Sequence, residues 1–264
     1  MVTEYDRLAK IYDYEWKDLR EDIELIIELA GKCGSPILEL AVGTGRVAIP
    51  LVKQGFEVVG IDNSIEMIKI CQEKISKLPE GLSSKINVIE GDMSNFSLEN
   101  RFKFIFISFN SFLLLSSKKE QEDCLKCVYN HLDGDGIFMI DIFSPNFKLC
   151  AEEKSDIRFL RHFYYPPENK VILQWEYAER NMAEQRIDID FLYEEYDKNG
   201  NLNRYTRHLN MAIIFRYEMQ LLLEKNGFEI LKFYGNHDKS KFTNKSPQMI
   251  YVCKKLTSLK RSKQ

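Results

Sequence analysis

The sequence lacks any segment that suits a membrane span or an export signal. It contains no run of about 18 apolar residues, and no charged and then apolar leader opens the chain. Its six cysteines are scattered along the chain. These absences predict a cytoplasmic protein in a reducing compartment, without membrane association.

An excess of basic residues is also missing. Lys and Arg total 37 against 40 Asp and Glu, which leaves a net charge of −3. A general nucleic-acid-binding protein would carry a basic face, so a nucleic-acid partner is not expected. The basic tail at residues 257–264 is interpreted as a frayed, solvated terminus.

Metal ligands are sparse as well. Cys124 and Cys127 have the spacing C-x-x-C, but no second cysteine pair follows. Both lie in a helical pattern with Leu125 and Val128, so we interpret them as ordinary helix residues. The sequence therefore predicts no metal site.

The residues that are present suit an α/β domain with a large insertion. A chain of 264 residues with 44% hydrophobic content can bury a sizeable core. Apolar runs alternate with helical patterns up to residue 143, which predicts a parallel, doubly wound sheet. Strands are predicted at 37–40, 56–61, 86–90, 102–109 and 137–143, helices at 18–30, 46–54, 64–77 and 120–132, and a turn at 133–136.

The pattern changes to period-two alternation between residues 159 and 214. Alternation at 171–177 and 187–194, with a hairpin turn at 197–200, predicts an antiparallel insertion of three or four strands. A helix at 217–225 and strands at 228–234 and 248–253 then resume the first pattern. The prediction is an α/β, doubly wound, seven-stranded Rossmann-like sheet with an antiparallel β insertion after the fifth strand. The core would comprise 1–158 and 215–256, followed by the tail 257–264.

Aromatic residues crowd the segment before the first strand. Tyr5, Tyr12, Tyr14 and Trp16 precede an amphipathic helix that Gly31 and Gly34 are expected to stop. The crowded segment is either an aromatic helix packed on the core or a cap over a ligand pocket, with tyrosine hydroxyls as polar tips. The sequence does not separate these two interpretations.

A glycine turn stands between the first strand and the first helix of the alternating pattern. Gly43, Gly45 and Ala48 satisfy G-x-G-x-x-[GA], and Asp62 ends the next strand. This βαβ unit is typical of nucleoside-containing ligands, but the pattern alone is shared by dinucleotide enzymes and others.

Glu39 argues against a dinucleotide. It ends the first strand, where a pyrophosphate would lie over the helix N-terminus and would be repelled by a carboxylate. A ligand with an ammonium and a sulfonium suits such a position, and S-adenosylmethionine (SAM) is one. Asp62 can accept both ribose hydroxyls, while Asp92 and Met93, after the third strand, can flank an adenine.

These stretches resemble the successive signatures of class I SAM-dependent methyltransferases. The similar segments are I-L-E-L-A-V-G-T-G-R, V-V-G-I-D-N-S-I-E-M, V-I-E-G-D-M, F-I-S-F-N-S-F-L-L-L and R-Y-E-M-Q-L-L-L-E-K-N-G-F. The resemblance covers most of the chain. The insertion looks like that of small-molecule N-methyltransferases acting on amino sugars or glycine-type amines, and would form the acceptor side or a lid.

The resemblance implies a set of cofactor-binding residues. It places Asp62 at the ribose of SAM, Asp92 and Met93 at the adenine, and Phe109 and Asn110 near the sulfonium. The residues at the methionine half would be Glu39, Ala41, Gly43 and Gly45. Arg46, with Tyr5 and Tyr12, would reach the methionine carboxylate. The full set is Tyr5, Tyr12, Glu39, Ala41, Gly43, Gly45, Arg46, Asp62, Asn63, Met67, Gly91, Asp92, Met93, Phe109 and Asn110.

The chain also departs from the family pattern. Ala41 replaces the usual first glycine, Lys103 an acid before the fourth strand, and Leu114 a histidine found in many relatives. A base is needed only if the acceptor enters protonated or is a hydroxyl. His208 and Tyr12 are the catalytic candidates, and the other residues considered are His162, Tyr164, Tyr165, Tyr234 and His237.

The leading hypothesis is SAM-dependent methyl transfer to a small-molecule amine or hydroxyl acceptor, releasing S-adenosylhomocysteine. An NAD-type oxidoreductase using the same glycine turn is an alternative, and a non-catalytic SAM-binding protein is another. The expected partner is a small-molecule acceptor, and the expected state is a monomer or homodimer.

Overall fold

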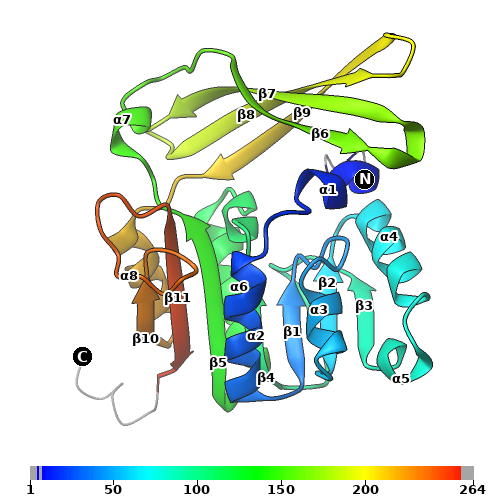
Figure 1. The fold of residues 1–264 in the computed structure, drawn as a ribbon. Coiled ribbons are helices and arrows are strands. Elements are labelled where there is room, and N and C mark those ends of the chain that lie inside the picture. Colours follow the sequence, from blue (N-terminus) through cyan, green and yellow to red (C-terminus); the bar gives the residue numbers. More distant parts are fainter. Residues whose placement is uncertain (1–4, 6–7, 257–264) are drawn as a thin grey trace.

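The computed structural model describes residue 5 and residues 8–256, so the basic tail at 257–264 lies outside the described residues. The described chain forms two sheets (Figure 1). The larger sheet contains β1 (Ile37–Leu40), β2 (Val58–Asp62), β3 (Ile86–Glu90), β4 (Phe102–Ile107), β5 (Leu132–Phe143), β10 (Phe228–Tyr234) and β11 (Gln248–Lys255). Among the described residues, no helix has the length and apolarity to cross a membrane.

The larger sheet has the strand order β10-β11-β5-β4-β1-β2-β3. Strands β1 to β5 pair in parallel, whereas β11 is antiparallel to both β5 and β10. The predicted seven-stranded sheet is thus confirmed, but it is mixed rather than wholly parallel. The chain order reverses between β1 and β4, and such a switch point leaves a crevice at the carboxyl ends of the strands.

Helices cover both faces of this sheet because its central strands are apolar on both sides. In β4, Phe104 and Phe106 pack against α2 and α3, while Ile105 and Ile107 face the side that carries α6 and α8. The helices are α1 (Ala9–Glu15), α2 (Glu21–Cys33), α3 (Ala48–Lys53), α4 (Ile65–Ile75), α5 (Glu80–Ser83), α6 (Lys118–His131), α7 (Phe147–Cys150) and α8 (Arg216–Lys225), with short 3₁₀ turns at Ser111–Leu114 and Pro166–Glu168.

Residues Arg158 to Ala212 form a separate four-stranded antiparallel sheet, which we call the insertion sheet. Its strands, in order across the sheet, are β6 (Arg158–Tyr165), β7 (Lys170–Asn181), β8 (Arg186–Tyr196) and β9 (Leu202–Ala212). In Figure 1 the insertion sheet lies across the carboxyl edge of the larger sheet. The predicted insertion after the fifth strand is therefore confirmed, with four strands. The predicted hairpin turn joins β8 to β9, and Gly200 adopts φ +80° there.

Helix α1 lies between the two sheets (Figure 1). Its residue Ile11 and the preceding Leu8 pack against Phe163 and Ile172 on the insertion sheet. On the other side, Asp13 accepts hydrogen bonds from Thr44 Oγ1 (2.6 Å) and Lys74 Nζ (2.7 Å), on the glycine turn and α4. The N-terminal segment thus ties the insertion sheet to the first βαβ unit.

Two local predictions need correction. Gly31 does not stop α2, which continues to Cys33 and ends at Gly34, where φ is +79°. Residues 133–136 are not a separate turn but part of a long β5. Phe102 pairs with Leu132 and Phe104 with Ile137, so these four residues bulge out of the ladder without ending the strand.

The interpretation of the C-x-x-C pair as helix residues is confirmed. Cys124 and Cys127 both lie in α6, and Cys124 is fully buried among apolar side chains. The helix begins at a capping box, in which Ser117 and Glu120 bond each other's backbone N–H groups. Cys124 therefore serves the packing of α6 on the larger sheet, while the half-buried Cys127 directs its Sγ to the carbonyl oxygen of Ser94 at 3.6 Å.

Candidate active site

A cavity lies at the carboxyl ends of β1, β2, β3 and β4, beside the point where the strand order reverses. Its non-protein space is about 890 Å³, part of it open to solvent. Its walls come from the N-terminal segment, the glycine turn, the ends of β2 and β3, and the segment after β4. The lining residues are Tyr5, Tyr12, Ala41, Gly43, Ile61, Asp62, Asn63, Met67, Gly91, Asp92, Met93, Phe109, Ser111, Leu114, Leu115 and Glu120.

Most of the predicted cofactor residues line this cavity, and four do not. Glu39, Gly45, Arg46 and Asn110 lie behind the wall. The lining residues absent from the predicted set are Ile61, Ser111, Leu115 and Glu120, together with Leu114, which was noted only as a departure from the family pattern. Ser111 and Leu114 bound the 3₁₀ turn after β4. The apolar run F-L-L-L, which contains Leu114 and Leu115, was the sequence feature that could have predicted this part of the cavity wall.

The glycine turn depends on residues that tolerate a left-handed backbone. Gly43 adopts φ +56°, and nothing lies within 4 Å of the Cβ that a larger residue would have there. Gly45 adopts φ +76°, and a Cβ at this position would come within 2.6 Å of Cys71 Sγ. Ala41 also adopts a positive φ, of +60°, which is uncommon for a residue other than glycine. Gly43 therefore faces open space, whereas Gly45 permits close packing of α4.

Asp62 links the end of β2 to the glycine turn. Its Oδ2 accepts the N–H of Gly43 at 2.7 Å, and its Oδ1 accepts the N–H of Ser64 at 2.8 Å. These bonds fix the carboxylate in the cavity wall. On the next strand end, Asp92 accepts bonds from the Ser94 N–H (2.7 Å) and hydroxyl (2.8 Å), which orders the turn that presents Met93.

Glu39 is buried beneath the glycine turn. It is 3% exposed, and its Oε2 has no hydrogen-bond partner. Burial raises the pKa of this carboxyl well above its usual value, although the nearby Arg46 opposes the shift. The predicted contact of Glu39 with a ligand ammonium remains a prediction, because this side chain does not line the cavity.

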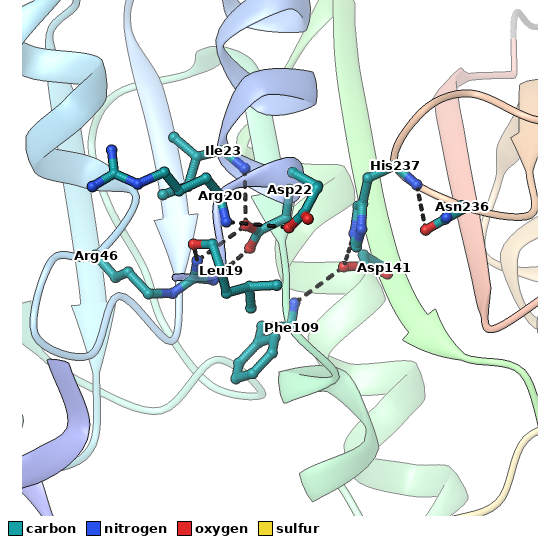
Figure 2. A network of polar contacts seen from close by, with 10 residues as sticks. Leu19, Arg20, Asp22, Ile23, Arg46, Phe109, Asp141, Asn236 and His237 are labelled. Carbon is teal, nitrogen blue, oxygen red and sulfur yellow. Dashed lines mark hydrogen bonds and ion pairs between the residues drawn. The ribbon is translucent and has the colours of Figure 1, made fainter. Parts of the chain in front are cut away.

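Arg46 is ion-paired with another residue of this protein. Its guanidinium forms a two-point ion pair with buried Asp22, with 3.0 Å between Nη1 and Oδ1 and a second bond from Nη2 to Oδ2 (Figure 2). It also lies 5.0 Å from the centre of the Phe109 ring. The predicted role at a ligand carboxylate thus requires Arg46 to share its donors with Asp22.

Asp141 and His237 form a second polar pair, which contacts the cavity wall at Phe109. Asp141, at the end of β5, accepts a bond from Phe109 N at 3.4 Å and contacts His237 Nε2 at 2.9 Å (Figure 2). Phe109 and Asn110 have φ of +55° and +65°, so the turn after β4 is strained. Burial lowers the pKa of His237, but the hydrogen bond and charge of Asp141, with Asp22 and Glu21, outweigh burial and raise it.

The inner face of the insertion sheet carries a buried polar cluster, which we call the inner-face cluster. Its members are Glu15 at the end of α1, Gln174 of β7, Tyr193 of β8 and Arg207 of β9, all of them buried. The guanidinium of Arg207 lies 4.3 Å from the centre of the ring of Tyr5, which lines the cavity. The sequence analysis did not identify this cluster, because its residues are far apart in the chain.

The structure does not bring the predicted base His208 to the cavity. It lies on the outer face of β9, 55% exposed, and pairs with Asp190 at 2.9 Å and Asp188 at 3.4 Å. This candidate is therefore corrected: side chains alternate along a strand, and Arg207 rather than His208 points inward. Tyr12 does line the cavity, and burial raises its pKa.

The other residues considered as bases also lie outside the cavity lining. His162 and Tyr164 are exposed on β6, and Tyr165 packs against Tyr14 of α1. Tyr14 and Trp16 pack rather than line the cavity: the Trp16 ring meets Phe109 edge-on at 4.7 Å between ring centres. The aromatic N-terminal segment therefore combines the two interpretations, since Tyr5 and Tyr12 face the cavity while its other rings pack.

Comparison with known proteins agrees with this architecture. A family model described as a methyltransferase domain matches residues 37–136. The glycine/sarcosine N-methyltransferase of Aphanothece halophytica is 27% identical over 83% of this chain and 76% of its own. The solved CcbJ methyltransferase from Streptomyces caelestis superposes with a TM-score of 0.80 at 22% identity, over 97% of this chain and 99% of its own.

Another solved structure with this fold is that of the sugar N-methyltransferase KedS8 from Streptoalloteichus sp ATCC 53650, with a TM-score of 0.70 at 18% identity, over 92% of this chain and 91% of its own. The matched family residues contain the glycine turn, Asp62 and Asp92, which line the cavity. The cofactor is accordingly SAM and not a dinucleotide. Residues 37–136 thus form the methyltransferase domain of a class I SAM-dependent enzyme, and the chain is related to the glycine/sarcosine N-methyltransferases and shares the fold of KedS8.

Proposed function

We propose that this methyltransferase transfers the methyl group of SAM to a nitrogen of a small-molecule amine. The relatives support nitrogen as the acceptor atom, because the A. halophytica enzyme and KedS8 are both named N-methyltransferases. The expected small-molecule acceptor fits a site covered by α1 and the insertion sheet. We further propose that 1–158 and 215–256 hold SAM and that 159–214 form the acceptor side.

The observation that carries the proposal is that the described cavity lining contains no histidine, and that its three carboxylates, Asp62, Asp92 and Glu120, already accept hydrogen bonds within the fold. None of the four histidines lines the cavity: His131 and His237 bond within the fold, while His162 and His208 are exposed. Burial raises the pKa of Tyr5 and of Tyr12, so both phenols stay protonated. A neutral amine brings its own lone pair, whereas a hydroxyl must lose a proton to react. The site therefore favours an amine.

The residues of the cavity fit SAM. The open space beside Gly43 leaves room for a ligand at the strand ends, and the carboxylate of Asp62 in the cavity lining suits the ribose hydroxyls. Asp92 and Met93 suit an adenine amine and its face. The unpartnered Oε2 of Glu39 suits an ammonium if the buried wall adjusts. When bound, SAM supplies an electrophilic methyl group on a sulfonium.

The chain itself mainly orients the reactants and excludes water. Asp13 holds α1 against Thr44 and Lys74, which keeps the N-terminal segment over the glycine turn. The ring of Phe109 contacts Trp16 and Arg46, and its backbone N–H donates to Asp141. Alignment and desolvation are the principal requirements of an in-line displacement at a cationic methyl donor.

Matched pairs of acceptors test the proposal. The enzyme and SAM are incubated with glycine and glycolate, propylamine and propanol, and glucosamine and glucose, and S-adenosylhomocysteine and methylated product are measured by mass spectrometry. We expect product only from amine members of the pairs. Methylation of a hydroxyl member without its amine would overturn the proposal, and a Gly43→Val enzyme serves as the inactive control.

A further inference from the structure

The inner-face cluster is buried but incompletely hydrogen-bonded. Gln174, Arg207 and Glu15 are 1%, 6% and 7% exposed. Gln174 Nε2 donates to the Tyr193 hydroxyl at 2.9 Å, and that hydroxyl lies 3.5 Å from Glu15 Oε2. Three buried atoms have no hydrogen-bond partner: Glu15 Oε1, Gln174 Oε1 and Arg207 Nε. Buried polar atoms are rarely left in this state, so three in one cluster call for an explanation.

The cluster adjoins the wall of the SAM cavity. Arg207 stacks over the ring of Tyr5 and bonds its hydroxyl, and the charge of Glu15 also acts on this phenol. The charge of Glu15 raises the pKa of the Tyr12 hydroxyl, and the charge of Arg207 lowers it. Tyr5 and Tyr12 both line the cavity, and Arg207 packs on the ring of Tyr5, so the cluster adjoins the cavity at these phenols. An acceptor in the cavity would reach the cluster by displacing them.

The chemistry of the three atoms defines a complementary ligand. The oxygens of Glu15 and Gln174 need hydrogen-bond donors, and the Nε–H of Arg207 needs an acceptor. Hydroxyl groups supply both functions. A carboxylate would satisfy Arg207 alone and would leave the oxygens of Glu15 and Gln174 unpartnered, while an apolar group would leave all three atoms unpartnered.

We propose that the inner-face cluster is the acceptor-recognition site of this enzyme and that it selects an amine carrying hydroxyl groups over an amine carrying a carboxylate. The proposal rests on the proposed function, methyl transfer to an amine. Glu15 and Gln174 accept bonds from the hydroxyls of the acceptor, and Arg207 donates one. The reacting nitrogen would then lie toward the SAM side of Tyr5 and Tyr12.

A panel of simple amines tests the selection without altering the protein. At saturating SAM, initial rates are measured for glucosamine and 3-amino-1,2-propanediol, for glycine and sarcosine, and for propylamine. We expect kcat/KM for the hydroxylated amines to exceed that for the other two groups by at least about tenfold. A preference for glycine or sarcosine would overturn the inference while leaving the proposed function intact. If no amine yields S-adenosylhomocysteine, the proposed function itself fails.

Two variants test the residues. Gln174→Leu and Arg207→Lys should raise KM for the hydroxylated amines by at least about tenfold, with little change in kcat or in the Kd of SAM. KM for propylamine should stay constant, which separates recognition from general damage to the fold. The exposed Gln54, replaced by leucine, is the matched control.

An equal change for every amine, or none, would contradict the assignment. Circular dichroism and thermal unfolding establish that each variant is folded. If Gln174→Leu does not fold, Gln174→Met keeps the length of the side chain and should impair the same acceptors, because it also removes the amide oxygen that accepts their hydroxyl groups.

Discussion

The two sides of the site are built in different ways. On the SAM side, backbone turns at the ends of adjacent strands form the wall, and two of its glycines, Gly43 and Gly45, need positive φ. On the insertion side, the wall is a set of side chains from α1 and three strands, at least 150 residues apart at the extremes of Glu15 and Arg207. The first is a local backbone structure, while the second exists only after the two sheets have come together.

Backbone strain is found on the SAM side, whereas buried unpartnered atoms are found on both sides. The SAM side contains three non-glycine residues in the left-handed region, Ala41, Phe109 and Asn110, each costing on the order of 1–3 kcal/mol, and the unpartnered Glu39 Oε2 and Asn110 Oδ1. The insertion side contains three buried unpartnered atoms, each costing about 1–3 kcal/mol. Both kinds of cost concentrate where a ligand would be bound, as is usual at functional sites.

Gly43→Val gives the largest expected effect. Valine at φ +56° is strained, and its side chain would fill the space beside Asp62. We expect no measurable SAM binding by isothermal titration calorimetry. Gly31→Ala is the control, because Gly31 lies within α2 with open space around it, and SAM binding should persist. A Kd of SAM within about tenfold of wild type for Gly43→Val would contradict the placement of SAM at the glycine turn.

Asp62→Ala should weaken SAM binding by more than about tenfold. The substitution removes the ribose contact that we propose and also the acceptor for the Gly43 N–H, so the glycine turn loses its tie to β2. Asp62→Asn keeps one oxygen and should lie between wild type and alanine. Calorimetry at one pH and salt concentration measures all three proteins, and an unchanged Kd for Asp62→Ala would contradict the assignment.

Variants on the insertion side should barely alter SAM affinity. Gln174→Leu changes a residue that does not line the SAM cavity, so the Kd of SAM should move by less than about threefold. Calorimetry on the same samples as for Asp62→Ala makes the comparison direct. A loss of SAM affinity in Gln174→Leu as large as that in Asp62→Ala would mean that the insertion side also contributes to SAM binding.

His237→Gln should destabilise the protein in a pH-dependent way. The pKa of His237 is raised in the folded state, so its contribution is fully present below its unfolded pKa of about 6.5 and is lost as the pH rises through the folded value. The unfolding free energy should therefore fall by on the order of 1 kcal/mol at low pH, and by less at high pH. Urea unfolding of wild type and His237→Gln at low and at high pH measures this loss. A loss of unfolding free energy that is the same at both pH values would contradict the role of the imidazolium.

His208→Gln should have the smallest effect. The hydrogen bond to Asp190 raises the pKa of His208 as well, so the sign of the pH dependence is the same. The pair is exposed, however, and salt screens it. Urea unfolding should show a smaller difference than for His237→Gln, and one that disappears in about 0.5 M NaCl. An equal effect for both histidines would mean that burial of the His237 pair does not matter.

Much of the architecture was predictable because it depends on residues close together in the chain. Short apolar runs and helical spacing located the strands of the larger sheet, and G-x-G with Asp62 located its glycine turn. The bulge at 133–136 was not predictable, because its glycines look like a turn until the pairing of β4 with β5 is known. The antiparallel direction of β11 likewise depends on sheet assembly.

The sequence by itself determined the local backbone: where the glycines must lie, which segments alternate, and that acids end successive strands beside a nucleoside-binding turn. Tertiary structure alone decided which face of the insertion sheet is buried. In T-R-H-L-N the period-two pattern treats Arg207 and His208 alike, and packing of α1 against the sheet makes Arg207 the inward residue. It also decided the partners of Arg46 and His237, since ion pairs between distant segments depend on how the elements pack and not on sequence spacing.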